Sequence, residues 1–70
     1  MALYDVTIFL ASGATAKIKQ QHDSQAHIRQ RISDQLGQET FELTSKTEQA
    51  VLFIKKPGVN IVGYFIDELS

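Results

Sequence analysis

The residue types best suited to chemistry in this sequence gather in the short segment His22–His27. Asp23 and His27 would share one face of a helix at positions i and i+4, a spacing that can hold a metal ion. The chain has only two histidines and no cysteine, so further ligands of this kind are scarce. We therefore interpret Asp23 as a residue that caps a helix beside two solvated histidines, and we predict no metal site and no cofactor.

Two other residue types could act in catalysis, and neither has the setting that catalysis needs. Ser12 precedes a glycine in an expected hairpin turn, not in the strand-to-helix elbow that presents a nucleophilic serine to a base. Three glutamates lie on or beside a short strand with no apolar pocket around them: Glu39, Glu42 and Glu48. We interpret them as solvated charges that oppose unwanted strand pairing. The sequence therefore predicts a protein that is not an enzyme.

A third set combines aromatic residues with lysines at strand positions. Its members are Phe9, Lys17, Lys19, Phe53 and Lys55. On an open sheet face, aromatic rings can stack single-stranded bases at about 1–3 kcal/mol per base, while lysines attract phosphates. The competing interpretation is that this face packs against a second subunit or another protein. It is favoured because Val51, Val59 and Ile61 are expected on the same face, and branched aliphatic side chains stack bases poorly.

The chain is organised around its C-terminal stretch, Ala50–Ile66, in which two apolar runs flank Lys56-Pro57-Gly58-Val59. Proline followed by glycine is typical of a type II turn, which needs a positive φ at the glycine. The sequence therefore predicts a hairpin of strands Ala50–Lys56 and Val59–Ile66. Gly63, inside the second strand, predicts a bulge or a close approach by another backbone.

Both strands of this expected hairpin carry apolar residues at odd-numbered and at even-numbered positions, so each strand would present apolar side chains on both faces of the sheet. A strand with one wet face alternates apolar and polar residues, because successive side chains point to opposite sides of a sheet. We therefore expect both faces to be covered, one by the helix and the other by a second copy of the chain. The predicted interface consists of Phe9, Val51, Phe53, Ile61 and Phe65.

The first half of the chain predicts a hairpin followed by a helix. Leu3–Leu10 has an apolar residue at every even position, and Ala14–Lys19 alternates apolar and polar residues. Between these two expected strands lies a turn that contains Gly13. Ser24–Leu36 has the four-residue apolar spacing of a helix, with Asp23 or Ser24 as the expected N-cap, and Gly37 is expected to end it in the left-handed conformation. Thr40–Thr44 alternates again. The expected fold is a single α+β domain, residues 1–70, with the order ββαβββ. It comprises two meanders in a mainly antiparallel sheet, with one helix packed on one face.

Composition narrows the possible settings of the protein. The net charge of −1 gives no general attraction to nucleic acid or to an anionic membrane. Basic residues dominate Ala14–Arg31 and acidic residues dominate Ile32–Ile54, a division that also permits head-to-tail association. No apolar run approaches the roughly 18 residues that span a bilayer, and the N-terminus lacks the basic segment of a signal peptide. We expect a cytoplasmic protein that does not bind membranes.

These observations favour a small non-enzymatic binding or structural domain that self-associates through the sheet face left uncovered by the helix. The alternative is a single-stranded nucleic-acid-binding module that uses the aromatic and lysine residues. A partner protein would use the same face. A metal or catalytic site at His22 and His27 is the least favoured hypothesis. The layout also suits small bacterial or phage proteins, although no motif specifies that origin.

Overall fold

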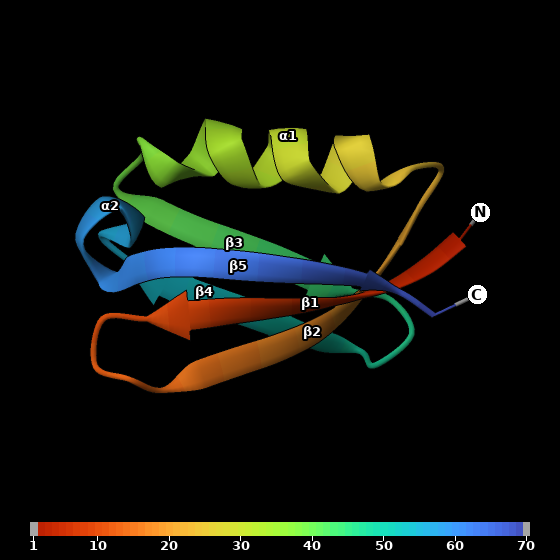
Figure 1. Ribbon diagram of the computed structural model, residues 1–70, viewed down its shortest axis with the longest axis horizontal. Helices are drawn as coiled ribbons and strands as arrows, with labels where there is room; N and C mark the ends of the chain where they lie inside the picture. Colours follow the sequence, from red (N-terminus) through yellow and green to blue (C-terminus); the bar gives the residue numbers. More distant parts are fainter. Residues whose placement is uncertain (1, 70) are drawn as a thin grey trace.

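The computed structural model describes residues 2–69 as an α+β fold with the order ββαβββ. Figure 1 shows the main helix above the strands. The elements are β1 (Ala2–Leu10), β2 (Thr15–His22), α1 (Gln25–Leu36), β3 (Thr40–Ser45), β4 (Ala50–Lys55), the single-turn helix α2 (Pro57–Asn60) and β5 (Ile61–Glu68). The predicted fold class is confirmed. Neither helix in this described range is long and apolar enough to cross a membrane.

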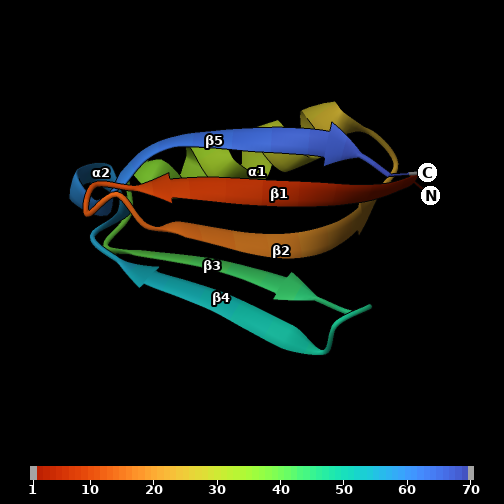
Figure 2. The same cartoon turned by 60° about the horizontal axis from the view of Figure 1, so that its bottom comes forward.

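The strands form two antiparallel sheets, one of three strands in the order β2-β1-β5 and one consisting of β3 and β4. Figure 2 shows β5, β1 and β2 side by side, with β3 and β4 following below them. The predicted first hairpin is confirmed, and in it Val6 lies opposite Ile18 and Ile8 opposite Ala16. The last strand returns to the first, so β1 and β5 are neighbours in one sheet.

The predicted hairpin between Ala50–Lys56 and Val59–Ile66 is wrong, because β4 and β5 lie in different sheets. Pro57 begins a helical turn instead of a type II turn, as proline commonly does at a first helical position. Gly58 does not have the expected positive φ; Lys56 takes the left-handed conformation, at φ 50°. After this turn, the Ala11 N–H donates to the Asn60 carbonyl at 2.8 Å, and the chain continues beside β1.

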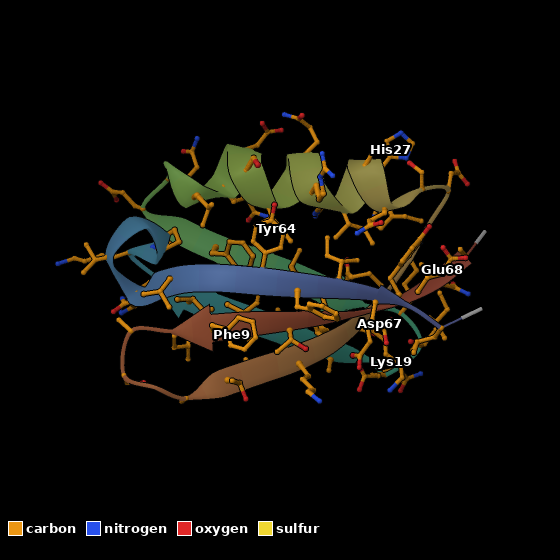
Figure 3. The ribbon with its side chains drawn as sticks, in the orientation of Figure 1. Phe9, Lys19, His27, Tyr64, Asp67 and Glu68 are labelled. Carbon is orange, nitrogen blue, oxygen red and sulfur yellow. The ribbon has the colours of Figure 1, made fainter. Side chains whose placement is uncertain are left out.

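The core lies between the inner faces of the two sheets and the helix. Its buried apolar side chains are Tyr4, Val6, Ile8, Ile18, Ile28, Ile32, Phe41 and Leu43. Figure 3 shows Tyr64 of β5 pointing towards α1. The predicted apolar stripe of the helix is confirmed, with Ile28 and Ile32 fully buried. Gly37 follows the helix as expected, but its φ of −89° is not left-handed.

Side chains, not a backbone ladder, connect the two sheets at one end. The Gln20 side chain is 5% exposed, and its Nε2 donates to the carbonyl oxygens of Lys19 (3.0 Å) and Thr44 (2.9 Å). The Lys19 N–H donates to Glu48 Oε1 at 2.7 Å. These bonds tie the end of β2 to the end of β3 and the following turn. They satisfy backbone groups that a continuous ladder would otherwise pair.

A β-bulge changes which residues of β5 point to the inner face of the sheet. Phe9 lies opposite Gly63 and Leu10 lies opposite Ile61, so Val62 is the extra residue between two aligned pairs. The bulge predicted near Gly63 is therefore confirmed. A Cβ placed on Gly63 would lie 3.8 Å from Cδ2 of Phe9, an ordinary contact, so the glycine is not required by lack of space.

Candidate interaction surfaces

The five residues of the predicted interface lie in three different places. Phe9 and Phe65 lie on the outer face of the three-stranded sheet, whereas Val51 and Phe53 lie on the exposed side of β4. Ile61 is partly buried and packs against the core. Its predicted place on an exposed face is wrong, because the bulge at Val62 shifts the alternation of the strand by one residue.

The edge strand β4 carries the first of these exposed surfaces. Among the described residues β4 pairs only with β3, and Figure 2 shows it as the outermost strand at the lower margin. Val51 is 59% exposed opposite Thr44, and Phe53 is 51% exposed opposite Glu42. No charged residue occurs from Ala50 to Ile54. The outer edge of β4 thus faces no other strand and carries large apolar side chains, and only at its end does the Lys55 carbonyl accept a hydrogen bond, from Asn60 Nδ2 at 2.6 Å. We call this strand, Ala50–Lys55, the β4 surface.

The outer face of the three-stranded sheet is aromatic at one end. Phe9 on β1 and Phe65 on β5 are both exposed. Because Thr7 lies opposite Phe65 and Gly63 lies opposite Phe9, the two rings occupy diagonal positions across adjacent strands. Diagonal neighbours of this kind lie about 7–8 Å apart, within reach of aromatic side chains. Lys17 on β2 lies opposite Thr7, so Lys17, Thr7 and Phe65 form one row across the three strands.

The other end of that face is charged with both signs. Asp5 lies opposite Lys19 on one side and opposite Asp67 on the other. Figure 3 shows Asp67 and Lys19 at the end of the sheet away from Phe9. Two carboxylates in this row oppose the approach of phosphates, which the lysine alone would favour.

The predicted nucleic-acid set is also divided between these surfaces. Phe9, Lys17 and Lys19 lie on the three-stranded sheet, whereas Phe53 and Lys55 lie on β4 in the other sheet. They do not form a single row of alternating aromatic and basic side chains. A strand of nucleic acid that used all five residues would have to pass from one sheet to the other.

A polar pocket of about 360 Å³ lies where the end of β2, the helix and the β3–β4 turn meet. Its lining residues are Gln20, Gln21, His22, Asp23, Arg31, Thr44 and Lys46. Neither Arg31 nor Lys46 stands out in the sequence, because the two residues come from separate elements and form no motif with His22–His27. Only the packing of the helix and the β3–β4 turn against β2 brings them to one cavity.

The histidine segment lies at this pocket. The ring centroids of His22 and His27 are 6.5 Å apart. Ser24, one of the two predicted capping residues, occupies the N-cap position, although its side chain makes no capping hydrogen bond. Within residues 2–69, no group of three or more histidines, cysteines or acidic residues could hold a metal ion.

The pKa of His22 is held below the ordinary value of 6.5. Burial is the largest cause, because it disfavours the charged imidazolium. Electrostatic interaction with the Arg31 guanidinium and with His27 lowers the pKa further, and the Asp23 carboxylate opposes this effect. At neutral pH the ring is therefore mainly uncharged, in a pocket whose other charged side chains are one arginine, one lysine and one aspartate.

Comparisons of the chain with protein-family models, with curated proteins and with solved structures found no match. The two exposed apolar surfaces and the polar pocket are therefore the features from which a function can be inferred.

Proposed function

We propose that this chain is a small non-enzymatic binding domain that associates with a second copy of itself along the β4 surface. The observation that carries the proposal is the unpaired edge of β4 together with the exposed Val51 and Phe53. An open strand edge presents unpaired N–H and C=O groups that another strand can bind. Natural proteins commonly protect such edges with charge, proline or a bulge, and Ala50–Ile54 contains no charged residue and no proline.

An antiparallel, two-fold pairing of β4 with its copy has a register in which the apolar residues match. Residues that lie opposite each other in an antiparallel pair point to the same face of the sheet. With Leu52 on the two-fold axis, Val51 of each copy lies opposite Phe53 of the other. A β-branched residue opposite an aromatic residue is a favourable cross-strand pair, worth about 0.2–1 kcal/mol.

The charges beyond the strand ends favour the same register. It places the end of β4 that leads into Lys56 beside the turn of the other copy that holds Glu48, and the two-fold axis repeats this approach. The register displaced by one step along the strand places Phe53 on the axis and Val51 opposite Lys55. That arrangement exchanges the two Val51–Phe53 pairs for one Phe53–Phe53 pair and brings a lysine against Val51 in both halves of the interface. The matching of apolar and charged residues therefore supports a second copy as the occupant of this edge.

The association should be weak. A six-residue strand edge with two exposed apolar side chains is a small interface, in the class below about 1,200 Å² that is typical of transient contacts. We therefore expect a monomer–dimer equilibrium that depends on protein concentration. The proposal includes a cytoplasmic location, which is compatible with a sequence without cysteine.

Sedimentation equilibrium of the unmodified protein and two variants tests the proposal. Phe53→Lys should shift the equilibrium towards monomer, because it removes apolar contact area and places a lysine in each half of the interface. Phe65→Lys is the matched control, since Phe65 is comparably exposed, at 57%, on the other sheet. It should leave the association unchanged. Loss of association in the Phe65 variant alone would contradict the proposal and place the contact on the three-stranded sheet.

Cross-linking tests the register directly, because the chain has no cysteine of its own. Val51→Cys and Phe53→Cys proteins should form a mixed disulfide dimer when combined under mild oxidation. Each protein alone should cross-link less, because neither residue lies opposite its own counterpart. Efficient cross-linking of the Phe53→Cys protein with itself would support the displaced register instead.

A protein that stays monomeric at high concentration would overturn self-association. Retention of that monomer on a single-stranded oligonucleotide at low salt, with loss at high salt, would then favour the nucleic-acid alternative. Dependence of the retention on Phe9 and Lys17, without dependence on Phe53, would assign it to the three-stranded sheet.

A further inference from the structure

We propose that the polar pocket between β2, α1 and the β3–β4 turn binds a small phosphorylated molecule, held by Arg31 and Lys46. This site is separate from the β4 surface and does not depend on self-association. Its two cationic side chains come from different elements, the arginine from the helix and the lysine from the turn. A single acidic side chain, Asp23, lines the same pocket.

The charge in the pocket favours a doubly charged anion. With His22 uncharged, Arg31 and Lys46 exceed Asp23 by one positive charge, and protonation of His22 adds a second. An arginine guanidinium can bind phosphate through two parallel hydrogen bonds, whereas a lysine contributes a point charge with rotatable donors. The pair therefore suits a phosphate group that bridges the helix and the turn.

The remaining space and the chemistry of Gln20 indicate what accompanies the phosphate. A cavity of about 360 Å³ is larger than a single phosphate ion requires and falls within the size range of small-molecule sites. Gln20 uses Nε2 for the carbonyls of Lys19 and Thr44, which leaves its carbonyl oxygen as an acceptor for a ligand. A hydroxyl group is the simplest partner for that oxygen. We infer a phosphate monoester of a small hydroxylated compound.

His22 couples this binding to pH. Its neighbours in the pocket are Arg31, Lys46 and Asp23, and the His27 ring approaches from the start of the helix. Asp23 is the only acidic side chain among these neighbours. A bound dianion would add negative charge beside His22, so it should raise the pKa of His22. By linkage, protonation of His22 should favour binding as the pH falls, whereas protonation of the phosphate, whose second pKa is about 6, opposes it.

Histidine ring NMR tests the proposal, because the chain has only two histidines. Glycerol phosphate and inorganic phosphate are added separately at constant ionic strength, with sodium chloride as the reference salt. Both phosphates should shift the His22 signals in a saturable manner and raise its pKa, and glycerol phosphate should bind more tightly. His27 should respond less. Equal affinity for the two phosphates would contradict the hydroxylated ligand and retain the phosphate site.

Two pairs of variants assign the binding to the pocket. Arg31→Gln should weaken phosphate binding about tenfold or more, as expected for loss of a charge-assisted bidentate contact. Arg29→Gln is its control, because residues two apart on a helix do not face the same side. Lys46→Gln should also weaken binding, whereas Lys56→Gln should leave it unchanged. Full binding by the Arg31 variant, or an equal effect of sodium chloride, would overturn the proposal.

The pH dependence provides an independent readout. Compared with the unmodified protein, His22→Gln should make phosphate binding weaken more steeply as the pH falls, and His27→Gln should keep the original pH dependence. An unchanged pH dependence in the His22 variant would overturn the coupling. Circular dichroism of each variant confirms that the fold is intact before binding is measured.

Discussion

Gln35, in the last turn of α1, forms two hydrogen bonds with the backbone of Glu42 in β3. Its Nε2 donates to the Glu42 carbonyl oxygen at 3.0 Å, and the Glu42 N–H donates to Gln35 Oε1 at 2.8 Å. The side-chain amide thus satisfies a strand edge much as a neighbouring strand would. It also fixes the end of the helix against β3, so the apolar stripe of the helix stays over the core.

Replacing Gln35 with leucine should lower the free energy of unfolding by about 1–2 kcal/mol, because two hydrogen bonds at a partly solvated edge are lost. Gln30→Leu is the control on the same helix. Gln30 donates only to Asp34, four residues along, so its replacement should cost less. Urea denaturation measures both. Equal losses for the two variants would show that the contact with Glu42 contributes little.

Ile32→Ala should destabilise the protein by about 2–5 kcal/mol, because it leaves a cavity at a fully buried position of the helix. That is a large share of the stability of a small domain. Val62→Ala, at a side chain that is 69% exposed, should cost less than about 0.5 kcal/mol. Thermal unfolding followed by circular dichroism compares the two. A loss below about 1 kcal/mol for the Ile32 variant would contradict close packing of the helix on the core.

Lys56 and Lys55 should respond in opposite ways to valine and glycine. Lys56 has a left-handed backbone (φ 50°, ψ 61°), which costs a β-branched residue roughly 1–2 kcal/mol and glycine almost nothing. Lys55 lies in β4 opposite Thr40, where valine is favourable and glycine is not. Chemical denaturation of the four variants should therefore show a reversed order of stability at the two positions. The same order at both would contradict the left-handed conformation of Lys56.

The stability of the protein should fall as the pH is lowered below about 6.5. The pKa of His22 is lower in the folded protein than in the unfolded chain, so the unfolded chain takes up its proton first. Stability is therefore complete above the unfolded pKa and decreases as the pH falls towards the folded pKa. Denaturation at a series of pH values between about 5 and 8 measures this dependence.

His22→Gln should flatten that pH dependence, whereas His27→Gln should keep most of it. No change in the slope for the His22 variant would show that another group causes it. These measurements are made without phosphate, because bound phosphate would itself raise the pKa of His22 under the proposal above.

The local patterns of the sequence determined the elements of this protein. Alternation over Leu3–Leu10 and Ala14–Lys19 gave the first hairpin, and the spacing of Ile28, Ile32 and Leu36 gave the buried stripe of the helix. These features depend on neighbours within a few residues, where a turn or a helical period fixes which side chains share a face. The α+β class and the order ββαβββ along the chain follow from them.

The partner of the last strand was decided only by the tertiary structure. Pro57-Gly58 is compatible with a type II turn and with a helical turn, and local sequence does not distinguish them. The helical turn directs β5 to the free edge of β1, and the bulge at Val62 then turns Ile61 inward. The pocket around His22 arises in the same way, because Arg31 and Lys46 reach it only when helix and turn pack against β2. Contacts between residues distant in the chain depend on which surfaces can be buried together, and no short pattern encodes that choice.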